Sequence, residues 1–268
     1  MQEYIKANKA LWNQKTEIHQ NSDFYQMPEF LKGATSLKPL ELALLGDVKG
    51  KKILHLQCHF GQDSISLARM GAEVTGIDLS DKSIAKAKEL AKTLEVDAHF
   101  ICCDIFETDQ FLEGQFDIIF TSYGTIGWLP TLDRWGQIIQ HFLKPNGRLV
   151  FVEFHPFIWT LDDASFTQIT YSYFNVEPII ETLSSSYTDG PKHAPMASYS
   201  WNHPLSEVFQ ALMTNGLFIE DFQEYNSSPY NCFPNTVVVS DGYQIKGMED
   251  KLPMVYSLLA RKKEKEII

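Results

Sequence analysis

Residues 52–78 read KILHLQCHFGQDSISLARMGAEVTGID, and their pattern decides the fold. The apolar run Lys52–Leu56 predicts a buried strand, and the spacing of apolar residues over Asp63–Met70 predicts a helix. A second apolar run, Glu73–Ile77, predicts another strand, which Asp78 follows. Strand, turn, helix and strand in this order form one unit of a doubly wound sheet, the arrangement that holds adenosine-containing cofactors.

The alternation of strands and helices continues along the chain. Helical spacing over Ser80–Leu94 and Leu132–Phe142 predicts two further helices, with Ser80 as the N-cap of the first. A turn signal, Lys144-Pro145-Asn146-Gly147, follows the second. Further strands are expected at Ala98–Cys102, Phe116–Thr121, Arg148–Phe154, Leu217–Glu224 and Met254–Arg261. The fold class is therefore α/β, with a doubly wound, Rossmann-like, seven-stranded mixed sheet.

The segments that flank this alternation predict a cover for the sheet. The first part of the chain is amphipathic and helical in pattern, whereas residues 155–203 are rich in Ser, Thr, Tyr and Pro. Within the latter, Gln168–Phe174 and Met196–Trp201 alternate like antiparallel strands, so a small β cap is expected. We expect the tail RKKEKEII to be frayed. The expected organisation is one domain, 1–268, with a helical cover (1–50), a cofactor-binding core (51–154), the β cap (155–203) and a C-terminal part of the sheet (204–268).

Composition and charge narrow the classes of function. The 268 residues contain 23 Lys and Arg against 34 Asp and Glu, a formal net charge of −11. This balance argues against general nucleic-acid binding, which needs clustered cations, although it leaves room for a local basic groove. No apolar stretch is long enough for a membrane span, and the first residues lack the apolar core of a signal peptide. The four cysteines form neither a disulfide framework nor a C-x-x-C pair, which favours a cytoplasmic protein.

The turn after the first strand separates two classes of cofactor. Nicotinamide enzymes need G-x-G-x-x-G at this turn, because a pyrophosphate must lie against the helix N-terminus. Here the turn reads QCHFGQD over residues 57–63, with a single glycine, Gly61. S-adenosylmethionine has no phosphate, so the missing glycines count against NAD and are neutral for the sulfonium cofactor.

On these residues the chain resembles the class I S-adenosylmethionine-dependent methyltransferases. LHLQCHFGQDSISLARMGAEVTGIDLS, residues 54–80, is similar to the first two motifs of a bacterial subgroup that begins with LHLQCH. The similarity covers nearly the whole chain, because it continues through FICCDIFE (100–107), FDIIFTSYGTIGWLP (116–130), LKPNGRLVFVEFHP (143–156), WNHPLSEV (201–208) and PMVYSLLARK (253–262).

The resemblance implies positions for the cofactor. The family's first motif is Asp-x-Gly-x-Gly-x-Gly; its aspartate corresponds to His55 and its glycines to Gln57, His59 and Gly61, of which only Gly61 is kept. This departure leaves open which groups hold the methionine carboxylate and amine. Asp78 stands where the family binds the ribose. The implied cofactor residues are Gln57, Cys58, His59, Gly61, Asp78, Leu79, Ser80, Asp104 (at the adenine), Ile105 and Ser122.

Candidates for the chemistry follow the later strands. His155 comes directly after the fifth predicted strand, where sheets of this kind place ligand contacts, so its imidazole could act as a general base. Tyr123, after the fourth strand, is the second catalytic candidate, and Glu153 is held in reserve. His155 could instead brace a loop, and Glu153 could be a paired, half-buried strand residue. Substrate or lid residues are expected among Trp12, Phe24, Tyr25, Trp128 and His203, the last also a reserve base.

These inferences predict methyl transfer from S-adenosylmethionine to an unidentified small-molecule acceptor. Two alternatives stay open: a non-catalytic protein that only binds S-adenosylmethionine, and a nicotinamide-dependent oxidoreductase. We expect no nucleic-acid or membrane partner. We also expect no metal, because His55 falls on a strand and His59 in a turn, and no Asp, Glu or Cys is placed to complete a site. The sequence leaves the acceptor and the oligomeric state undetermined.

Overall fold

A seven-stranded mixed sheet forms the centre of the protein, as the sequence predicts. The structure is a computed structural model and describes residues 2–175 and 177–263. The strand order is β3-β2-β1-β4-β5-β11-β8, in which β11 runs antiparallel to both β5 and β8 and the other pairs are parallel. The strands are β1 Lys52–His55, β2 Glu73–Asp78, β3 Ala98–Cys102, β4 Phe116–Ser122, β5 Leu143–Phe154, β8 Leu217–Tyr225 and β11 Val255–Lys262.

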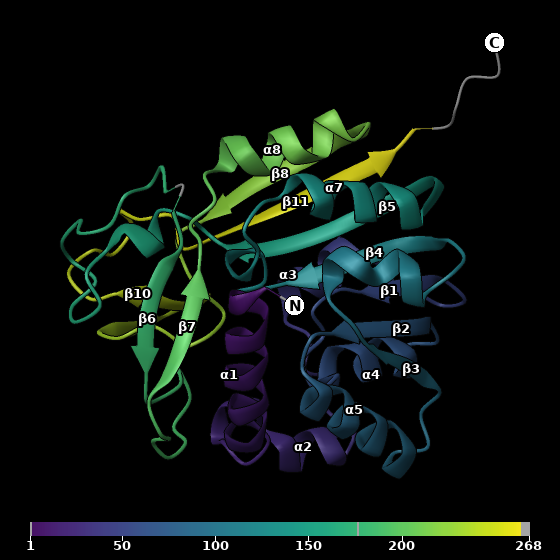
Figure 1. The fold of residues 1–268 in the computed structure, drawn as a ribbon, viewed down its shortest axis with the longest axis horizontal. Coiled ribbons are helices and arrows are strands. Elements are labelled where there is room, and N and C mark those ends of the chain that lie inside the picture. Colours follow the sequence, from purple (N-terminus) through teal and green to yellow (C-terminus); the bar gives the residue numbers. More distant parts are fainter. Residues whose placement is uncertain (1, 176, 264–268) are drawn as a thin grey trace.

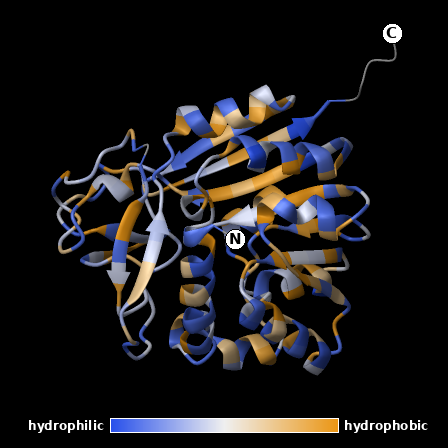
Figure 2. Ribbon diagram, in the orientation of Figure 1, coloured by the Kyte–Doolittle hydropathy of each residue, from blue (hydrophilic) through white to orange (hydrophobic). Residues whose placement is uncertain are grey.

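Helices cover both faces of this sheet (Figure 1). On one face, α3 (Pro39–Leu45), α4 (Gln62–Arg69) and α5 (Asp81–Thr93) bury apolar residues against the strands. On the other face, α7 (Asp133–Phe142) and α8 (Leu205–Thr214) enclose the largest apolar cluster, around Trp135. Because the sheet is covered on both faces, its central strands are apolar on both sides: β5 is mainly hydrophobic in Figure 2. The helices, which have one face in solvent, carry both hydrophobic and hydrophilic residues.

Local signals explain where the helices begin and where the pairing breaks. The Ser80 hydroxyl accepts a hydrogen bond from the Ser83 amide at 3.0 Å, which confirms Ser80 as the N-cap of α5. The predicted turn at 144–147 lies inside β5, because pairing with β4 already begins at Leu143 and then shifts register before Arg148. A short 3-10 turn, η2 (Ile105–Glu107), and α6 (Thr108–Phe111) follow β3.

The N-terminal segment lies across the carboxyl ends of the strands. It consists of α1 (Glu3–His19), η1 (Asp23–Tyr25) and α2 (Met27–Leu31). Helix α1 stands between α5 and the β cap (Figure 1). Asn8 joins it to the cap, because its amide donates to the Tyr199 carbonyl at 2.8 Å and accepts from the Tyr199 amide at 3.0 Å. The expected helical cover is therefore present, as the long helix α1, the short elements η1 and α2, and α3.

The β cap is present, but the prediction of one of its strands, Gln168–Phe174, is wrong. Its antiparallel hairpin pairs β6 (Ile179–Leu183) with β7 (Met196–Ser200), whereas 168–174 forms only an isolated bridge between Leu161 and Ile169. The reason is Asp162, whose carboxylate accepts backbone N–H groups of Ser165, Thr167 and Gln168 and so turns the chain away from a ladder.

Two later segments complete the chain. A second small hairpin, β9 (Thr236–Val239) and β10 (Gly242–Ile245), fills the insert between β8 and β11. The predicted frayed tail falls mostly on residues 264–268, outside the described residues. In the described parts of the chain, no helix is both long and apolar enough to cross a membrane.

Candidate functional site

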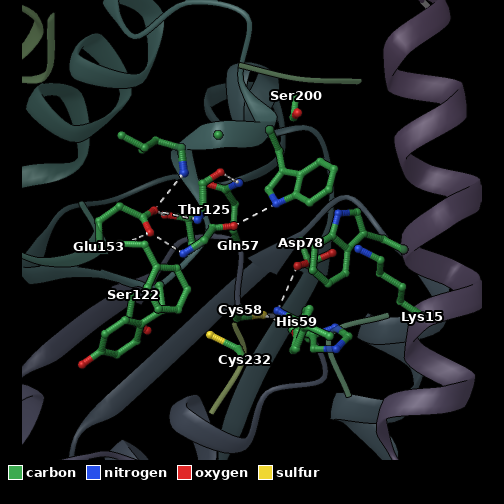
Figure 3. A pocket seen from close by; sticks show the side chains of 18 of the residues that line it. Lys15, Gln57, Cys58, His59, Asp78, Ser122, Thr125, Glu153, Ser200 and Cys232 are labelled. Atoms are coloured by element: carbon green, nitrogen blue, oxygen red, sulfur yellow. Dashed lines mark hydrogen bonds between the residues drawn. The ribbon is translucent and has the colours of Figure 1, made fainter. Parts of the chain in front are cut away.

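A cavity of about 500 Å³ lies where the strand ends, α1 and the β cap meet (Figure 3). All but one of the cofactor residues named from the sequence line this cavity. They are Gln57, Cys58, His59, Gly61, Asp78, Leu79, Asp104, Ile105 and Ser122. The predicted substrate or lid residues Trp12, Phe24, Tyr25, Trp128 and His203 also line it, as does Tyr123. The structure therefore brings together side chains from elements that are far apart in the sequence.

The turn after β1 adopts the conformation that glycines usually provide. Gln57 and His59 have φ values of 53° and 50°, and Gly61 has 80°, so all three positions are left-handed. A Cβ atom on Gly61 would lie 2.7 Å from the Phe100 ring and 2.9 Å from Ala87, so this position requires glycine. The two larger residues cost on the order of 1–3 kcal/mol each in backbone strain, which tertiary contacts must offset.

Asp78 presents its carboxylate to this turn. One oxygen, Oδ2, accepts the His59 amide at 2.9 Å, and the other, Oδ1, accepts the Ser80 amide at 2.8 Å. Burial raises the pKa of Asp78 to about 6, against the lowering effect of these amides. Each carboxylate oxygen can accept a further hydrogen bond. Asp78 can thus accept two hydroxyl groups from the cavity, as a ribose diol would require.

Ser80 is the exception among the predicted cofactor residues. It is fully buried and does not line the cavity. Its hydroxyl donates to Asn13 Oδ1 at 2.6 Å and accepts the Ser83 amide, so the hydroxyl is used for the N-cap and for packing of α1. The assignment of Ser80 to the cofactor was wrong; its backbone amide instead holds the carboxylate of Asp78.

The next part of the cavity is apolar with one acidic group. Leu79, Ile105 and Phe106 line it. Asp104 Oδ1 accepts the Phe106 amide at 2.9 Å, so the carboxylate begins η2, and burial raises its pKa. Its other oxygen has no hydrogen bond to the described residues. Asp104 thus both begins a turn and faces the cavity, and its contact with adenine stays a prediction.

Gln57 carries an unsatisfied acceptor. Its amide nitrogen donates to the Thr125 carbonyl at 2.8 Å, which fixes the orientation of the side chain (Figure 3). Its oxygen, Oε1, is buried without a hydrogen-bond partner among the described residues. A buried acceptor of this kind costs about 1–3 kcal/mol unless a ligand satisfies it. An ammonium group in the cavity would do so.

His155, the leading candidate for a general base, does not line the cavity. Its Nδ1 accepts the Phe157 amide at 3.1 Å, and its Nε2 lies 2.9 Å from Glu224 on β8. His155 lies one residue beyond the end of β5, so the alternation of the strand does not fix the direction of its imidazole, which meets β8 at Glu224. The prediction that His155 is the catalytic base is therefore wrong, and the loop-bracing alternative holds.

The reserve candidates are also occupied. The Glu153 carboxylate accepts backbone amides of Gly124, Thr125 at 2.7 Å and Ile126 at 3.2 Å, and so holds the loop after β4 (Figure 3). His203 donates from Nε2 to the Leu129 carbonyl at 2.8 Å, and its Nδ1 lies 3.0 Å from Glu207. Neither side chain is available to remove a proton.

Tyr123 lies in the cavity beside a buried acid that sequence reasoning missed. Its hydroxyl donates to Glu41 Oε2 at 3.2 Å, and its ring packs edge-on against Tyr230 at 5.0 Å. Burial, and to a lesser degree Asp63, raise the pKa of Glu41 to about 8. No signal around Glu41, on a short amphipathic helix, pointed to this role.

Sequence reasoning also missed residues that line the cavity. Five of them come from the cover and the inserts, whose paths the sequence does not specify: Lys15, Glu181, Tyr187, Tyr230 and Cys232. The sixth, Asp63, lies in the first turn of α4. Lys15 could have been found, because it follows Trp12 by three residues and therefore shares its helix face.

Comparisons with known proteins agree with this geometry. Residues 53–147 match a family model described as a methyltransferase domain. A solved structure of a putative S-adenosylmethionine-dependent methyltransferase from Listeria monocytogenes has the same fold, with a TM-score of 0.60 and 19% identity over 84% of this chain and 98% of that one.

Two curated relatives are similar over part of the chain. An uncharacterized protein of Haemophilus influenzae is 33% identical over 54% of this chain and 60% of its own length. A 23S rRNA (uracil(1939)-C(5))-methyltransferase of Burkholderia pseudomallei is 35% identical over 43% of this chain and 26% of its own length. The chain thus spans less than two thirds of these relatives.

Proposed function

We propose, from the premise that this chain belongs to the class I S-adenosylmethionine-dependent methyltransferases, that it transfers a methyl group from S-adenosylmethionine to a small molecule. Family membership follows from the matched domain together with the fold. The observation that carries the proposal is Asp78, whose half-buried carboxylate lines the cavity and is oriented there by the backbone amides of His59 and Ser80.

The polar and apolar groups that line the cavity fit S-adenosylmethionine and not a dinucleotide. Asp78 would hold the ribose hydroxyls, Leu79 and Ile105 would flank the adenine, and Gln57 Oε1 would accept from the methionine ammonium. When bound, S-adenosylmethionine supplies an electrophilic methyl group on a positively charged sulfur. Gln57 and His59 carry side chains in the left-handed turn positions where a pyrophosphate site needs glycines, which counts against the nicotinamide alternative.

The chain's own residues would exclude water and position the acceptor. Helix α1 and the segment between β6 and β7 cover the cavity, and Phe24, Tyr25 and Tyr187 form an aromatic wall. The Tyr123 hydroxyl uses its hydrogen in the bond to Glu41. Towards a ligand, the phenol oxygen can therefore act only as a hydrogen-bond acceptor. Tyr123 would thus orient an acceptor hydroxyl or amine, and we assign most of the rate enhancement to this positioning.

A small molecule is favoured over RNA as the acceptor by the net charge of −11 and by the residues of α1 and the β cap that line the cavity. The similarity to an rRNA methyltransferase makes RNA the alternative to be tested. We also propose a cytoplasmic location, which the free thiols of all four cysteines support.

The test is incubation of the protein with methyl-labelled S-adenosylmethionine and a cell extract separated into low-molecular-weight, RNA and protein fractions. We expect label in the low-molecular-weight fraction, and none with the Asp78→Ala variant. Label in RNA would contradict the choice of acceptor. Binding of S-adenosylhomocysteine without label in any fraction would support the non-catalytic alternative.

A further inference from the structure

One face of α1 lines the cavity along its length. Tyr4, Asn8, Trp12 and Lys15 follow one another at spacings of three or four residues, and all four line the cavity. Tyr4 lies at the end near Asp104, whose charge contributes to raising the pKa of the phenol after burial. Lys15 lies about 16 Å further along the axis, at 1.5 Å per residue.

Lys15 is a buried cation without an anionic partner. Only 4% of its surface is exposed. Its Nζ lies 4.7 Å from the centroid of the Trp12 ring, 5.0 Å from that of Trp128 and 5.8 Å from that of Tyr187. Within the described residues, no hydrogen bond and no carboxylate within 4.0 Å satisfies it. Lys9, on the same helix, differs: it is partly exposed and pairs with Asp81 at 3.2 Å.

The environment of Lys15 is arranged for an anion. Burial lowers the pKa of its ammonium to about 8, while the charge of Glu181 on the cap opposes this, so the group is mainly protonated at neutral pH. Aromatic faces attract an ammonium but leave its three N–H donors without acceptors. A protonated amine buried in this way indicates a ligand that supplies negative charge and oxygen acceptors.

The position of Lys15 relative to the turn identifies that ligand group. Figure 3 shows Lys15 on the same side of the cavity as His59 and Asp78. The Trp12 ring beside it is 5.3 Å from the His59 ring and 5.2 Å from Trp128. Tyr4, at one end of α1, thus lies near Asp104, and Trp12, beside Lys15, contacts His59, whose amide bonds Asp78. Gln57 Oε1 offers an acceptor in the same cavity.

We propose that Lys15, caged by Trp12, Trp128 and Tyr187, binds the carboxylate of the methionine part of S-adenosylmethionine. This inference rests on the proposed function. It names the group that binds the methionine carboxylate in a protein whose cofactor turn keeps only one of the family's three glycines, Gly61. It makes α1 part of the cofactor site, where its stripe of cavity residues runs beside the whole length of the cofactor.

The test compares two ligands that differ in the group in question. S-adenosylhomocysteine carries the amino acid part, whereas 5′-methylthioadenosine keeps the adenosine and the thioether but has neither ammonium nor carboxylate. Calorimetric titration should show that Lys15→Met weakens S-adenosylhomocysteine at least about tenfold, the loss of one charge-assisted hydrogen bond. Affinity for 5′-methylthioadenosine should be unchanged, and Lys15→Arg should keep most of the affinity for both.

Controls separate the possible results. Lys6→Met removes the same charge from an exposed position of α1 and should change neither affinity. Binding of 5′-methylthioadenosine reports whether Lys15→Met is folded; Lys15→Gln replaces it if that variant is not. Unchanged S-adenosylhomocysteine affinity, or an equal loss for both ligands, would overturn the role of Lys15. A wild-type protein that binds neither ligand would instead overturn the proposed function.

Discussion

At the scale of single residues, the ionisation of Asp78 should control cofactor binding. The folded protein raises the pKa of this carboxyl to about 6 from an ordinary value near 3.9, chiefly by burial. Hydroxyl donors bind the ionised form more strongly, so S-adenosylhomocysteine affinity should be constant above about pH 7 and fall as the pH decreases through 6. Titrations at several pH values test this, and Asp78→Asn should bind weakly with no such pH dependence.

The same pKa shift predicts an effect on stability with the opposite direction. A raised pKa means that the folded state holds a proton that the unfolded state has released between about pH 4 and 6. The stabilisation from Asp78 is therefore complete at low pH and lost as the pH rises through 6. Denaturant unfolding should show Asp78→Asn gaining stability relative to wild type as the pH rises; a constant difference would contradict the shifted pKa.

At the scale of elements, the loop after β4 depends on Glu153. Its buried carboxylate accepts several backbone amides of residues 124–126, and removing it would leave those donors without partners. We expect Glu153→Ala to lose on the order of 3 kcal/mol of unfolding free energy, measured with denaturant. His155→Ala, two residues further along the chain and outside the cavity, should keep cofactor affinity near wild type. Loss of cofactor affinity in His155→Ala alone would contradict the assignment of His155 to a position outside the cofactor site.

A second element-scale prediction concerns the tip of the cap hairpin, residues 184–190, which fastens to the N-terminal segment. Ser186 bonds His19 at 2.6 Å, the hydroxyls of Tyr187 and Tyr25 are 2.6 Å apart, and Asp189 accepts the Asp23 amide at 3.2 Å. A cofactor beneath this closure should slow hydrogen exchange in 12–25 and 184–190 together. The β9–β10 hairpin is the internal control; equal exchange with and without S-adenosylhomocysteine would make the closure purely structural.

At the scale of the whole molecule, ligand binding should appear as stability. A ligand at 100 times its Kd stabilises the folded state by about 2.7 kcal/mol. For a chain of this size that corresponds to a rise in Tm of roughly 5–10 °C. S-adenosylhomocysteine should produce this rise in a thermal melt and NAD should not. A comparable rise with NAD would favour the nicotinamide alternative.

The sequence by itself determined the sheet, the cofactor turn and the acid that follows β2. These are local features: a strand, a turn and a helix N-terminus are encoded by neighbouring residues, so Gly61, Asp78 and Asp104 fall at the cavity wherever the unit folds. Strand positions survived with shifts of a few residues for the same reason, except where Asp162 turned the chain and moved the cap strand to 179–183.

Only the tertiary structure decided which side chains meet in the cavity and which do not. His155 and Ser80 stand at expected positions in the sequence, yet their polar atoms bond to Glu224 and Asn13 instead. Lys15 and Glu41 come from the cover, and their burial depends on contacts with segments far away along the chain. The direction of a side chain and the charge it meets are set by packing between distant elements, and no local pattern of residues contains that information.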